Sequence, residues 1–300
     1  DSKTAYVTLQ ENNAVAALDL TNDSWVYVKG LGFKDHSASG NGLDLDVDGA
    51  VAIRNESVYG VYMPDGIACA TINGKDYLLT ANEGDAREWG DYKNIASGKL
   101  PLSDGATAEK KIEYLKTDAT DGLEEGKTYL LGGRSFSVWD AETLKQVYDS
   151  GDNLEQISAK NFPAYFNSGH DAAGELDKRS NKKGPEPESV ATVTANGKTY
   201  AIVGLERMGG IMAFDISDLN HVTYADYLNV RDFTCGDLAR AGDLGAEGIC
   251  TVSADDSPTG NAMILVANEI SGTVTVAQIE TKSSSGGSSS GGSSSGGSSS

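Results

Sequence analysis

Short runs of alternating apolar and polar residues recur along the chain, separated by turns rich in Gly and Asn. A period of two residues is typical of β-strands that bury one face. The Asn-Gly pairs at 73–74 and 196–197 lie between such runs and predict tight hairpins. No helical segment separates the units, so the pattern predicts an all-β fold.

An internal repeat organises these strands. Each copy opens with a β-rich run of four or five residues, and in most copies a turn and a second alternating run follow. The five copies begin at Tyr6, Tyr77, Tyr129, Tyr200 and Met263. Four of them place a glutamate after the first run, namely Glu11, Glu83, Glu206 and Glu269. Because these residues match at fixed offsets, the repeat indicates equivalent structural units.

A second motif precedes three copies: an acidic residue, then Gly or Ser, then a β-branched residue. Its acidic members are Asp65, Glu188 and Glu247. Together the two motifs predict a meander of about four antiparallel strands, and serial repetition of such units favours a β-propeller. A β-sandwich, whose strands recur at similar spacing, is the alternative.

The spacing of the copies is uneven, which predicts long loop insertions at residues 88–125 and 149–183. The first copy lacks the acidic half-motif, so we expect an N-terminally truncated propeller over residues 1–282. Residues 283–300 contain only Ser and Gly and are expected to form a flexible linker. Such a linker, natural or engineered, would lead to a cell-surface anchor or a further C-terminal domain.

Equivalent glutamates on equivalent strands would point towards a common axis. Converging carboxylates do not all stay ionised without a cation, and oxygen-only ligands suit Ca²⁺. The alternative is that each glutamate accepts backbone N–H groups and locks neighbouring sheets together. The candidate metal ligands in this group are Glu83, Asp85, Glu188, Glu206, Glu247 and Glu269.

A second acidic site is local. Asp44, Asp46 and Asp48 alternate along the chain and are followed by Gly49, a pattern that can wrap one side of Ca²⁺. The twelfth position of an EF-hand would be Asn55, so this is not an EF-hand loop. A solvated acidic turn is the alternative.

Catalytic motifs are missing from the sequence: there is no GxSxG elbow and no HExxH, and the three histidines lie in or beside loops. No catalytic residue is assigned. Three arginines follow or adjoin the repeat motif and are candidates for binding an anionic ligand, unless they neutralise their acidic neighbours. They are Arg87, Arg134 and Arg207.

The net charge of −20 and the pI near 4.4 exclude a nucleic-acid partner. No apolar stretch approaches the roughly 18 residues of a membrane span, and no export signal is present in the sequence. Three cysteines without CxxC spacing indicate free thiols. An acidic body joined to a tether suits an extracellular, cell-surface protein.

Seven ordered motifs, among them YVTLQENN from Tyr6, LTANEGDAR from Leu79 and VANEISG from Val266, resemble the choice-of-anchor I family. That family is similar to echinoderm mesenchyme-specific cell surface glycoproteins and to some atypical bacterial alkaline phosphatases. The resemblance implies an exported propeller of the YVTN/WD40-like class, with seven or eight blades and a C-terminal surface anchor. Some members resemble calcium-requiring phosphatases or phytase-like esterases.

These observations favour a secreted, surface-tethered, calcium-associated β-propeller that binds a partner or forms surface structure. The alternative is a calcium-dependent phosphomonoesterase, in which Arg87 or Arg207 would clamp the phosphoryl oxygens. A matrix protein that nucleates mineral is a third reading. The expected ligand is a phosphorylated small molecule or a surface glycan.

Overall fold

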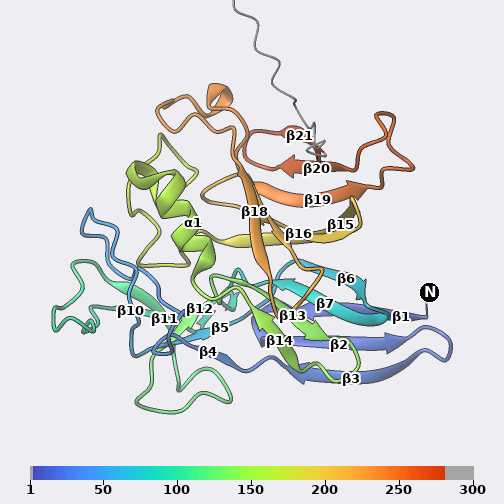
Figure 1. Ribbon diagram of the computed structural model, residues 1–300. Helices are drawn as coiled ribbons and strands as arrows, with labels where there is room; N and C mark the ends of the chain where they lie inside the picture. Colours follow the sequence, from blue (N-terminus) through green and yellow to red (C-terminus); the bar gives the residue numbers. More distant parts are fainter. Residues whose placement is uncertain (1–2, 281–300) are drawn as a thin grey trace, which may run out of the picture.

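The computed structural model describes residues 3–280, and four antiparallel sheets follow one another along this part of the chain (Figure 1). The first sheet contains β1 (Thr4–Leu9), β2 (Ala14–Asp19) and β3 (Ser24–Gly30). The second contains β6 (Ile67–Ile72), β7 (Lys75–Ala81), β13 (Phe136–Asp140) and β14 (Gln146–Asp149). The third contains β15 (Pro187–Ala195), β16 (Lys198–Leu205), β17 (Ile211–Asp215) and β18 (Thr223–Leu228). The fourth contains β19 (Ala246–Val252), β20 (Met263–Asn268) and β21 (Thr273–Gln278).

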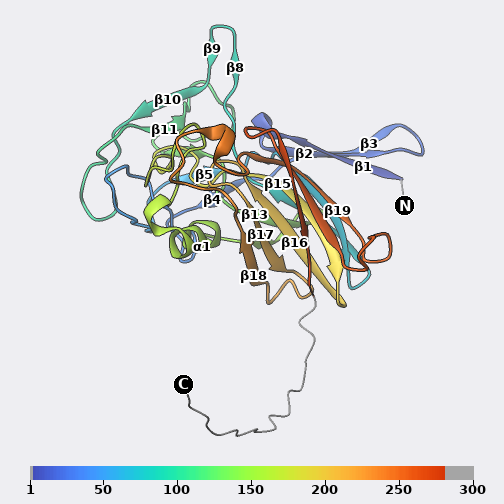
Figure 2. The ribbon, with the colours of Figure 1, turned by 90° about the horizontal axis from the view of Figure 1, so that it is seen from above.

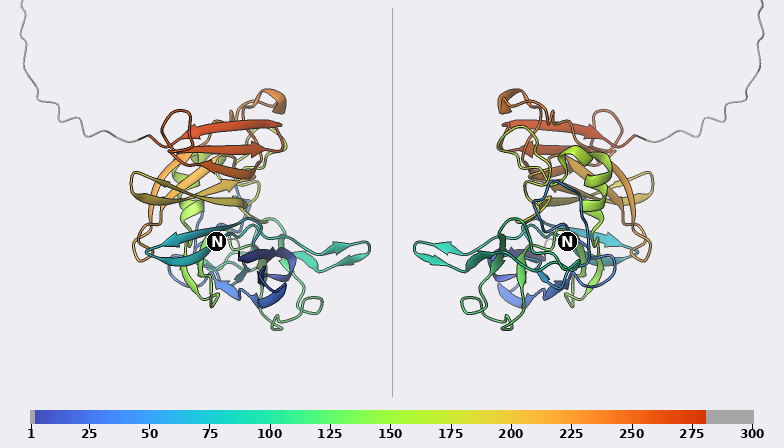
Figure 3. Two further views of the ribbon diagram at one scale, coloured as in Figure 1. Left: turned by 90° about the vertical axis from the view of Figure 1, so that its right-hand side faces the viewer. Right: turned by 90° about the vertical axis from the view of Figure 1, so that its left-hand side faces the viewer.

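The sheets lie one above another in chain order, as Figure 3 shows from both sides. A separate apolar cluster fills each interface between successive sheets. Leu78 packs towards the first sheet, whereas its neighbour Leu79 packs towards the third. Because both faces of β7 are buried at this point, Tyr77, Leu78 and Leu79 are consecutive apolar residues and do not alternate with polar ones.

Strands β6, β15 and β19 occupy the same position, the edge that precedes the second strand of each sheet. They are neighbours in space, since β15 packs against both β6 and β19. These three strands begin at the acidic half-motifs. The ends of the strands that carry the repeat therefore meet along one line of the molecule.

One part of the repeat was predicted wrongly. The copy that begins at Tyr129 is not a separate unit: β12 (Tyr129–Leu131) pairs in parallel with β5 (Tyr59–Val61), beside β4 (Phe33–Asp35). Its second run, β13, pairs instead with β7. The copies at Tyr77 and Tyr129 thus supply two halves of one sheet, and the insertion between them hides this in the sequence.

Both predicted insertions carry structure. Residues 88–125 form two hairpins, β8 (Glu88–Trp89) with β9 (Tyr92–Lys93) and β10 (Ile95–Gly98) with β11 (Ile112–Leu115), and the first projects from the body (Figure 2). Residues 149–183 contain α1 (Asn153–Asn161) and η2 (Pro163–Tyr165). Two further 3₁₀ turns are η1 (Gln10–Asn12) and η3 (Leu238–Arg240).

The all-β prediction is confirmed for the described residues, with α1 as their one α-helix. The sheets do not form a closed ring there, so the propeller stays a prediction. None of the helices described is both long and apolar enough for a membrane span. Cys69, Cys235 and Cys250 are free thiols. The predicted linker at 283–300 lies outside the described residues.

Candidate functional site

Three β-bulges position acidic side chains where the sheets meet. Glu188 is the extra residue between Pro187 and Ser189 in the pairing of β15 with β16, and Glu247 occupies the same place in β19. In the second sheet, Asp65 and Gly66 both bond the backbone of Ala81, so two residues again face one. A bulge re-aims the side chain of its extra residue. The acidic half-motif of the sequence is therefore a bulge.

Glu83, Glu206 and Glu269 follow β7, β16 and β20, the strands that pair with the bulged strands. Five carboxylates gather there from the second and third sheets, and we call them the acidic junction. Its members are Asp65, Glu83, Glu186, Glu188 and Glu206. Oxygens of Asp65, Glu83 and Glu188 lie within 4.8 Å of one another, and so do those of Glu83, Glu186 and Glu206.

Three cations face the acidic junction. Lys183 Nζ contacts a Glu83 oxygen and lies 3.2 Å from Glu186 Oε2. Arg179 pairs with Glu186, and Arg207 lies 3.1 Å from Glu186 and 3.2 Å from Glu206. The acidic junction thus has two more carboxylates than cationic side chains. One divalent ion or two protons would balance this difference.

The carboxylates of the acidic junction differ in pKa: one is lowered by neighbouring cations, and the others are raised by burial. Although burial opposes ionisation of Glu186, Lys183, Arg179 and Arg207 hold its pKa below the usual value. Burial raises the pKa of Glu206 to about 8, and the charge of Glu186 adds to the effect. Burial also raises the pKa of Glu83. Without a bound metal ion, the raised pKa values of Glu83 and Glu206 favour the protonated forms.

Burial, reinforced by Glu83 and Asp65, raises the pKa of Glu188 furthest above its usual range. Burial likewise raises the pKa of Asp65. Neither residue has a salt bridge among the described residues. Asp65 and Glu188 are therefore the carboxylates of the acidic junction that lack a cation, and Glu83 lies beside them.

The other predicted carboxylates lie at the rim or elsewhere. Glu247 and Glu269 are exposed, and the charge of Glu247 acts on Glu188. Asp85 is also exposed, and its charge acts on Asp65. Glu11 does not join this group; it lines a separate pocket of about 200 Å³.

In the first sheet it is Gln10 that reaches the acidic junction. Gln10 Nε2 donates to Glu83 Oε2 at 2.6 Å. The prediction for Glu11 was wrong by one residue because η1 interrupts the strand and turns the neighbouring side chain inwards.

Two of the predicted arginines face away from the acidic junction. Arg87 donates to the Glu11 carbonyl oxygen at 3.2 Å and lines the pocket near Glu11. Arg134 is buried, and its guanidinium donates to four acceptors within the protein: Asp44 O, Glu155 Oε1, Ser180 O and Lys182 O. With these acceptors bound, Arg134 has a structural role, and only Arg207 adjoins the acidic junction.

The Asp44 loop does not gather its carboxylates. Asp44 accepts a hydrogen bond from the Ala52 amide at 2.6 Å, and Asp46 accepts one from the Glu109 amide at 2.7 Å. Asp48 accepts one from Ala50 at 2.9 Å. Each carboxylate thus fixes a different backbone segment. The calcium site at this loop stays a prediction.

Sequence reasoning missed Glu186, Arg179 and Lys183, and placed His170 only in or beside a loop. All except Glu186 lie in the insertion at 149–183, whose weak periodicity hides its fold. Glu186 stands two residues before Glu188, a spacing that could have drawn attention to it. The alternative of backbone locking finds no support, because no backbone amide of the described residues donates to the carboxylates of Glu83 or Glu188.

The family model of the choice-of-anchor I domain matches residues 1–219. The chain is 31% identical to Gigasin-3a of Magallana gigas over 195 residues, which cover 61% of this chain and 64% of that protein. It is 25% identical to the mesenchyme-specific cell surface glycoprotein of Strongylocentrotus purpuratus over 138 residues, 40% of this chain and 18% of that protein. The chain thus spans less than two thirds of either relative. A match over most of its length shows that the chain belongs to the choice-of-anchor I family.

Proposed function

We propose that this protein is an extracellular, surface-associated module of β-propeller type that binds calcium where its sheets meet. Asp65, Glu83 and Glu188 would hold the ion. One observation carries the proposal: three oxygens from two successive sheets converge within 4.8 Å, in a junction with two more carboxylates than cationic side chains. Oxygen-only donors of this kind fit Ca²⁺ better than a softer metal.

The surrounding residues would orient the ligands. Gln10 donates to one oxygen of Glu83, and Lys183 contacts the other. These contacts fix the carboxylate plane and leave Asp65 and Glu188 to complete the set. When bound, calcium would supply a positive charge that bridges the second and third sheets, while Gln10 links the first sheet to the same group.

The propeller arrangement is supported by the shared position of β6, β15 and β19, whose acidic ends meet along one line. A surface location is supported by family membership and by the sea-urchin relative, which is named as a cell surface glycoprotein. We infer that the module presents loops such as the β8–β9 hairpin to an extracellular partner.

Hydrolysis of phosphomonoesters has less support than binding. That mechanism needs an arginine free to clamp phosphoryl oxygens. Arg87 lies elsewhere, and Arg207 already pairs with Glu186 and Glu206. Binding therefore stands as the conclusion.

The test is calcium titration of the chelator-treated protein by calorimetry. Wild type is expected to bind Ca²⁺ with a Kd of about 0.1–1 mM, the range of extracellular modules. Glu188→Gln removes one ligand and is expected to weaken binding at least about tenfold. Glu175→Gln, an exposed carboxylate outside the acidic junction, is the matched control. Equal binding by wild type and Glu188→Gln would refute the site.

The same samples decide the enzymatic alternative. A generic phosphomonoester is offered to the wild type with Ca²⁺ and with chelator. No turnover is expected in either condition. Calcium-dependent turnover that disappears in Glu188→Gln would replace the binding role with a catalytic one.

A further inference from the structure

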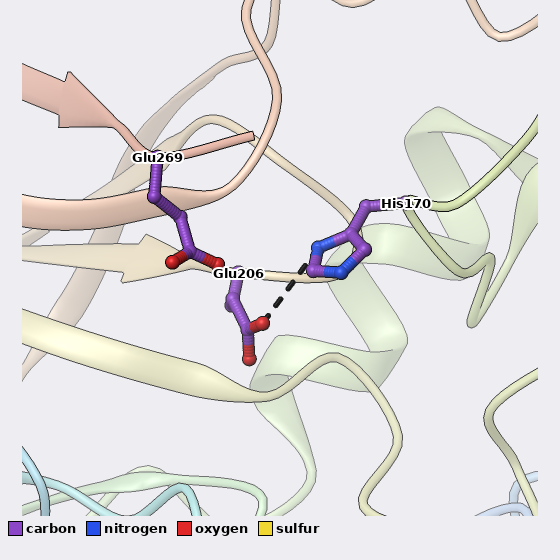
Figure 4. A group of neighbouring side chains, drawn as sticks. All are labelled: His170, Glu206 and Glu269. Atoms are coloured by element: carbon purple, nitrogen blue, oxygen red, sulfur yellow. Dashed lines mark ion pairs between the residues drawn. The ribbon is translucent and has the colours of Figure 1, made fainter. Parts of the chain in front are cut away.

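Glu206 of the acidic junction lies close to His170 and Glu269, but the histidine there is already engaged (Figure 4). The Arg207 guanidinium can only donate, so its contact with His170 Nε2 leaves the ring proton on Nδ1, the nitrogen that faces Glu206. No lone pair of the ring is then left for a ligand. The pocket near Glu11 is different, because several of its polar groups are unused.

The pocket near Glu11 has a volume of about 200 Å³ and lies between the first sheet and the insertion at 88–125. Pockets for drug-sized ligands begin at roughly 300 Å³, so this one has room for a single small ring. Its apolar wall includes Phe33 and Met63. Phe33 is 40% exposed and packs on the Tyr129 ring, with ring centroids 5.0 Å apart. The pocket therefore offers a fixed aromatic surface to a ligand.

The rim of the pocket carries both acceptors and donors of hydrogen bonds. Glu11 and Asp121 contribute carboxylates, and neither has a salt bridge or a side-chain hydrogen bond among the described residues. Arg87 uses its Nε on the Glu11 carbonyl oxygen and its Nη2 on Asn12, whereas its Nη1 bonds no other described residue. Two carboxylates and one guanidinium N–H group are thus available to a ligand.

Hydrogen bonds hold the walls of this pocket in place. Asn13 Nδ2 donates to the Gly32 carbonyl oxygen at 2.8 Å, and Asn13 Oδ1 accepts the Met63 amide at 2.9 Å. The buried Asn94 accepts the Arg87 amide at 2.9 Å. The walls are therefore formed before a ligand arrives, and binding does not need to order a loop.

We propose that the pocket near Glu11 binds an uncharged hexose ring. Carboxylates only accept hydrogen bonds and a guanidinium only donates them. A phosphate group would offer acceptors alone and would face the charges of Glu11 and Asp121, whereas an ammonium group would offer donors alone and would face Arg87. A sugar ring carries hydroxyl groups that donate and accept side by side, and its apolar C–H face packs on the negative face of an aromatic ring such as Phe33.

Two exposed aromatic residues indicate that the hexose belongs to a glycan. Trp89 is 62% exposed and Tyr92 is 42% exposed, and their ring centroids lie 6.2 Å apart on the projecting β8–β9 hairpin. The guanidinium of Arg87, which lines the pocket, lies 6.0 Å from the Trp89 ring. Exposed aromatic residues are common at binding surfaces. A second sugar unit, linked to the hexose in the pocket, would find Trp89 beside it.

The experiment is a titration with the methyl glycosides of glucose, galactose and mannose, measured by saturation-transfer NMR. At least one is expected to bind with a Kd in the millimolar range, as befits a small ligand. The 6-phosphate and the 2-amino derivative of the same sugar are expected to bind more weakly. Glu11→Gln and Asp121→Asn each replace a charged acceptor by a neutral one and should weaken binding at least about fivefold. Asp118→Asn, which changes an exposed carboxylate of the same loop outside the pocket, should leave binding unchanged.

This site and the proposed calcium site fail separately. They share no residue, so hexose binding is expected to persist in chelator and in Glu188→Gln. Trp89→Ala should weaken binding of a disaccharide glycoside several-fold while leaving the monosaccharide unaffected; an unchanged disaccharide affinity would assign the pocket to a free hexose instead. Absence of saturable binding by any hexose, tighter binding of the 6-phosphate or the amino sugar, or unchanged binding in both Glu11→Gln and Asp121→Asn would overturn the proposal.

Discussion

A single buried charge in this protein can join distant chain segments through its hydrogen bonds. Arg134 is the clearest case, because its guanidinium bonds four acceptors that belong to three separate segments of the chain. One of these is Glu155, itself 1% exposed. The arginine therefore joins the Asp44 loop, helix α1 and the loop before β15.

Replacement of Arg134 should unfold this region. In Arg134→Ala, Glu155 keeps a buried charge without its cation, and we expect a loss of about 3–5 kcal/mol of unfolding free energy. Arg134→Lys should also destabilise, since an ammonium group does not reproduce the planar fork. Urea denaturation measures both, with Arg240→Ala as an exposed control. A loss below about 1 kcal/mol in Arg134→Ala would show that these bonds do not stabilise the fold.

Asp177 makes stability depend on pH. Its Oδ2 accepts the amides of Asp48 and Gly49, while its Oδ1 has no hydrogen-bond partner. Burial raises the pKa of Asp177 to about 6, above the value near 3.9 of an unfolded chain. The folded state then binds the proton more tightly, so this stability is present below about pH 4 and is lost as the pH rises through 6.

We expect Asp177→Asn to remove that part of the pH dependence. Between about pH 4 and pH 7 the unfolding free energy of wild type should fall by about 2 kcal/mol more than that of the variant. Urea denaturation at several pH values measures the difference. Parallel pH profiles for the two proteins would contradict the assignment.

Tight backbone crossings hold the elements around the acidic junction. Gly132 has a φ of +79°, and a Cβ atom there would lie 2.1 Å from the Glu83 carbonyl oxygen. Gly74 has nearly the same φ, +76°, but a Cβ atom there would meet nothing within 4 Å. Both glycines have a positive φ, but only Gly132 is crowded. Comparing alanine substitutions at the two positions therefore separates the cost of backbone strain from the cost of crowding.

Gly132→Ala should therefore cost about 2 kcal/mol or more of unfolding free energy beyond Gly74→Ala. It should also weaken calcium binding several-fold, because the backbone that carries Glu83 must move. Thermal denaturation and calorimetry measure the two effects. If both variants lose the same stability, crowding at Gly132 is not important.

The sequence predicted structure correctly where neighbouring residues alone determine the backbone conformation. The acidic half-motifs could be predicted as equivalent because an acid followed by Gly or Ser forms the same bulge in each sheet. It failed where partners are distant: the pairing of β12 with β5 depends on residues 70 positions apart. Lys183 could not be assigned to Glu83 for the same reason, since a flexible side chain in an insertion has no periodic signal.

At the scale of the whole molecule, successive sheets place the acidic ends of their strands along one line. The insertion at 149–183 adds cationic side chains there, but fewer than the carboxylates of the acidic junction. The net charge of −20 makes this excess costly across the protein as well as at the acidic junction. A bound divalent ion would relieve it and add a further link between sheets that already meet through apolar packing and through hydrogen bonds such as that from Gly66 N to Glu188 O.

The most direct test of this account is anomalous diffraction from crystals of the protein grown with calcium. We predict a peak bound by oxygens of Asp65, Glu83 and Glu188 at about 2.3–2.6 Å. Well-ordered carboxylates at these positions, with Lys183 as their cation and no anomalous peak at millimolar calcium, would contradict the account.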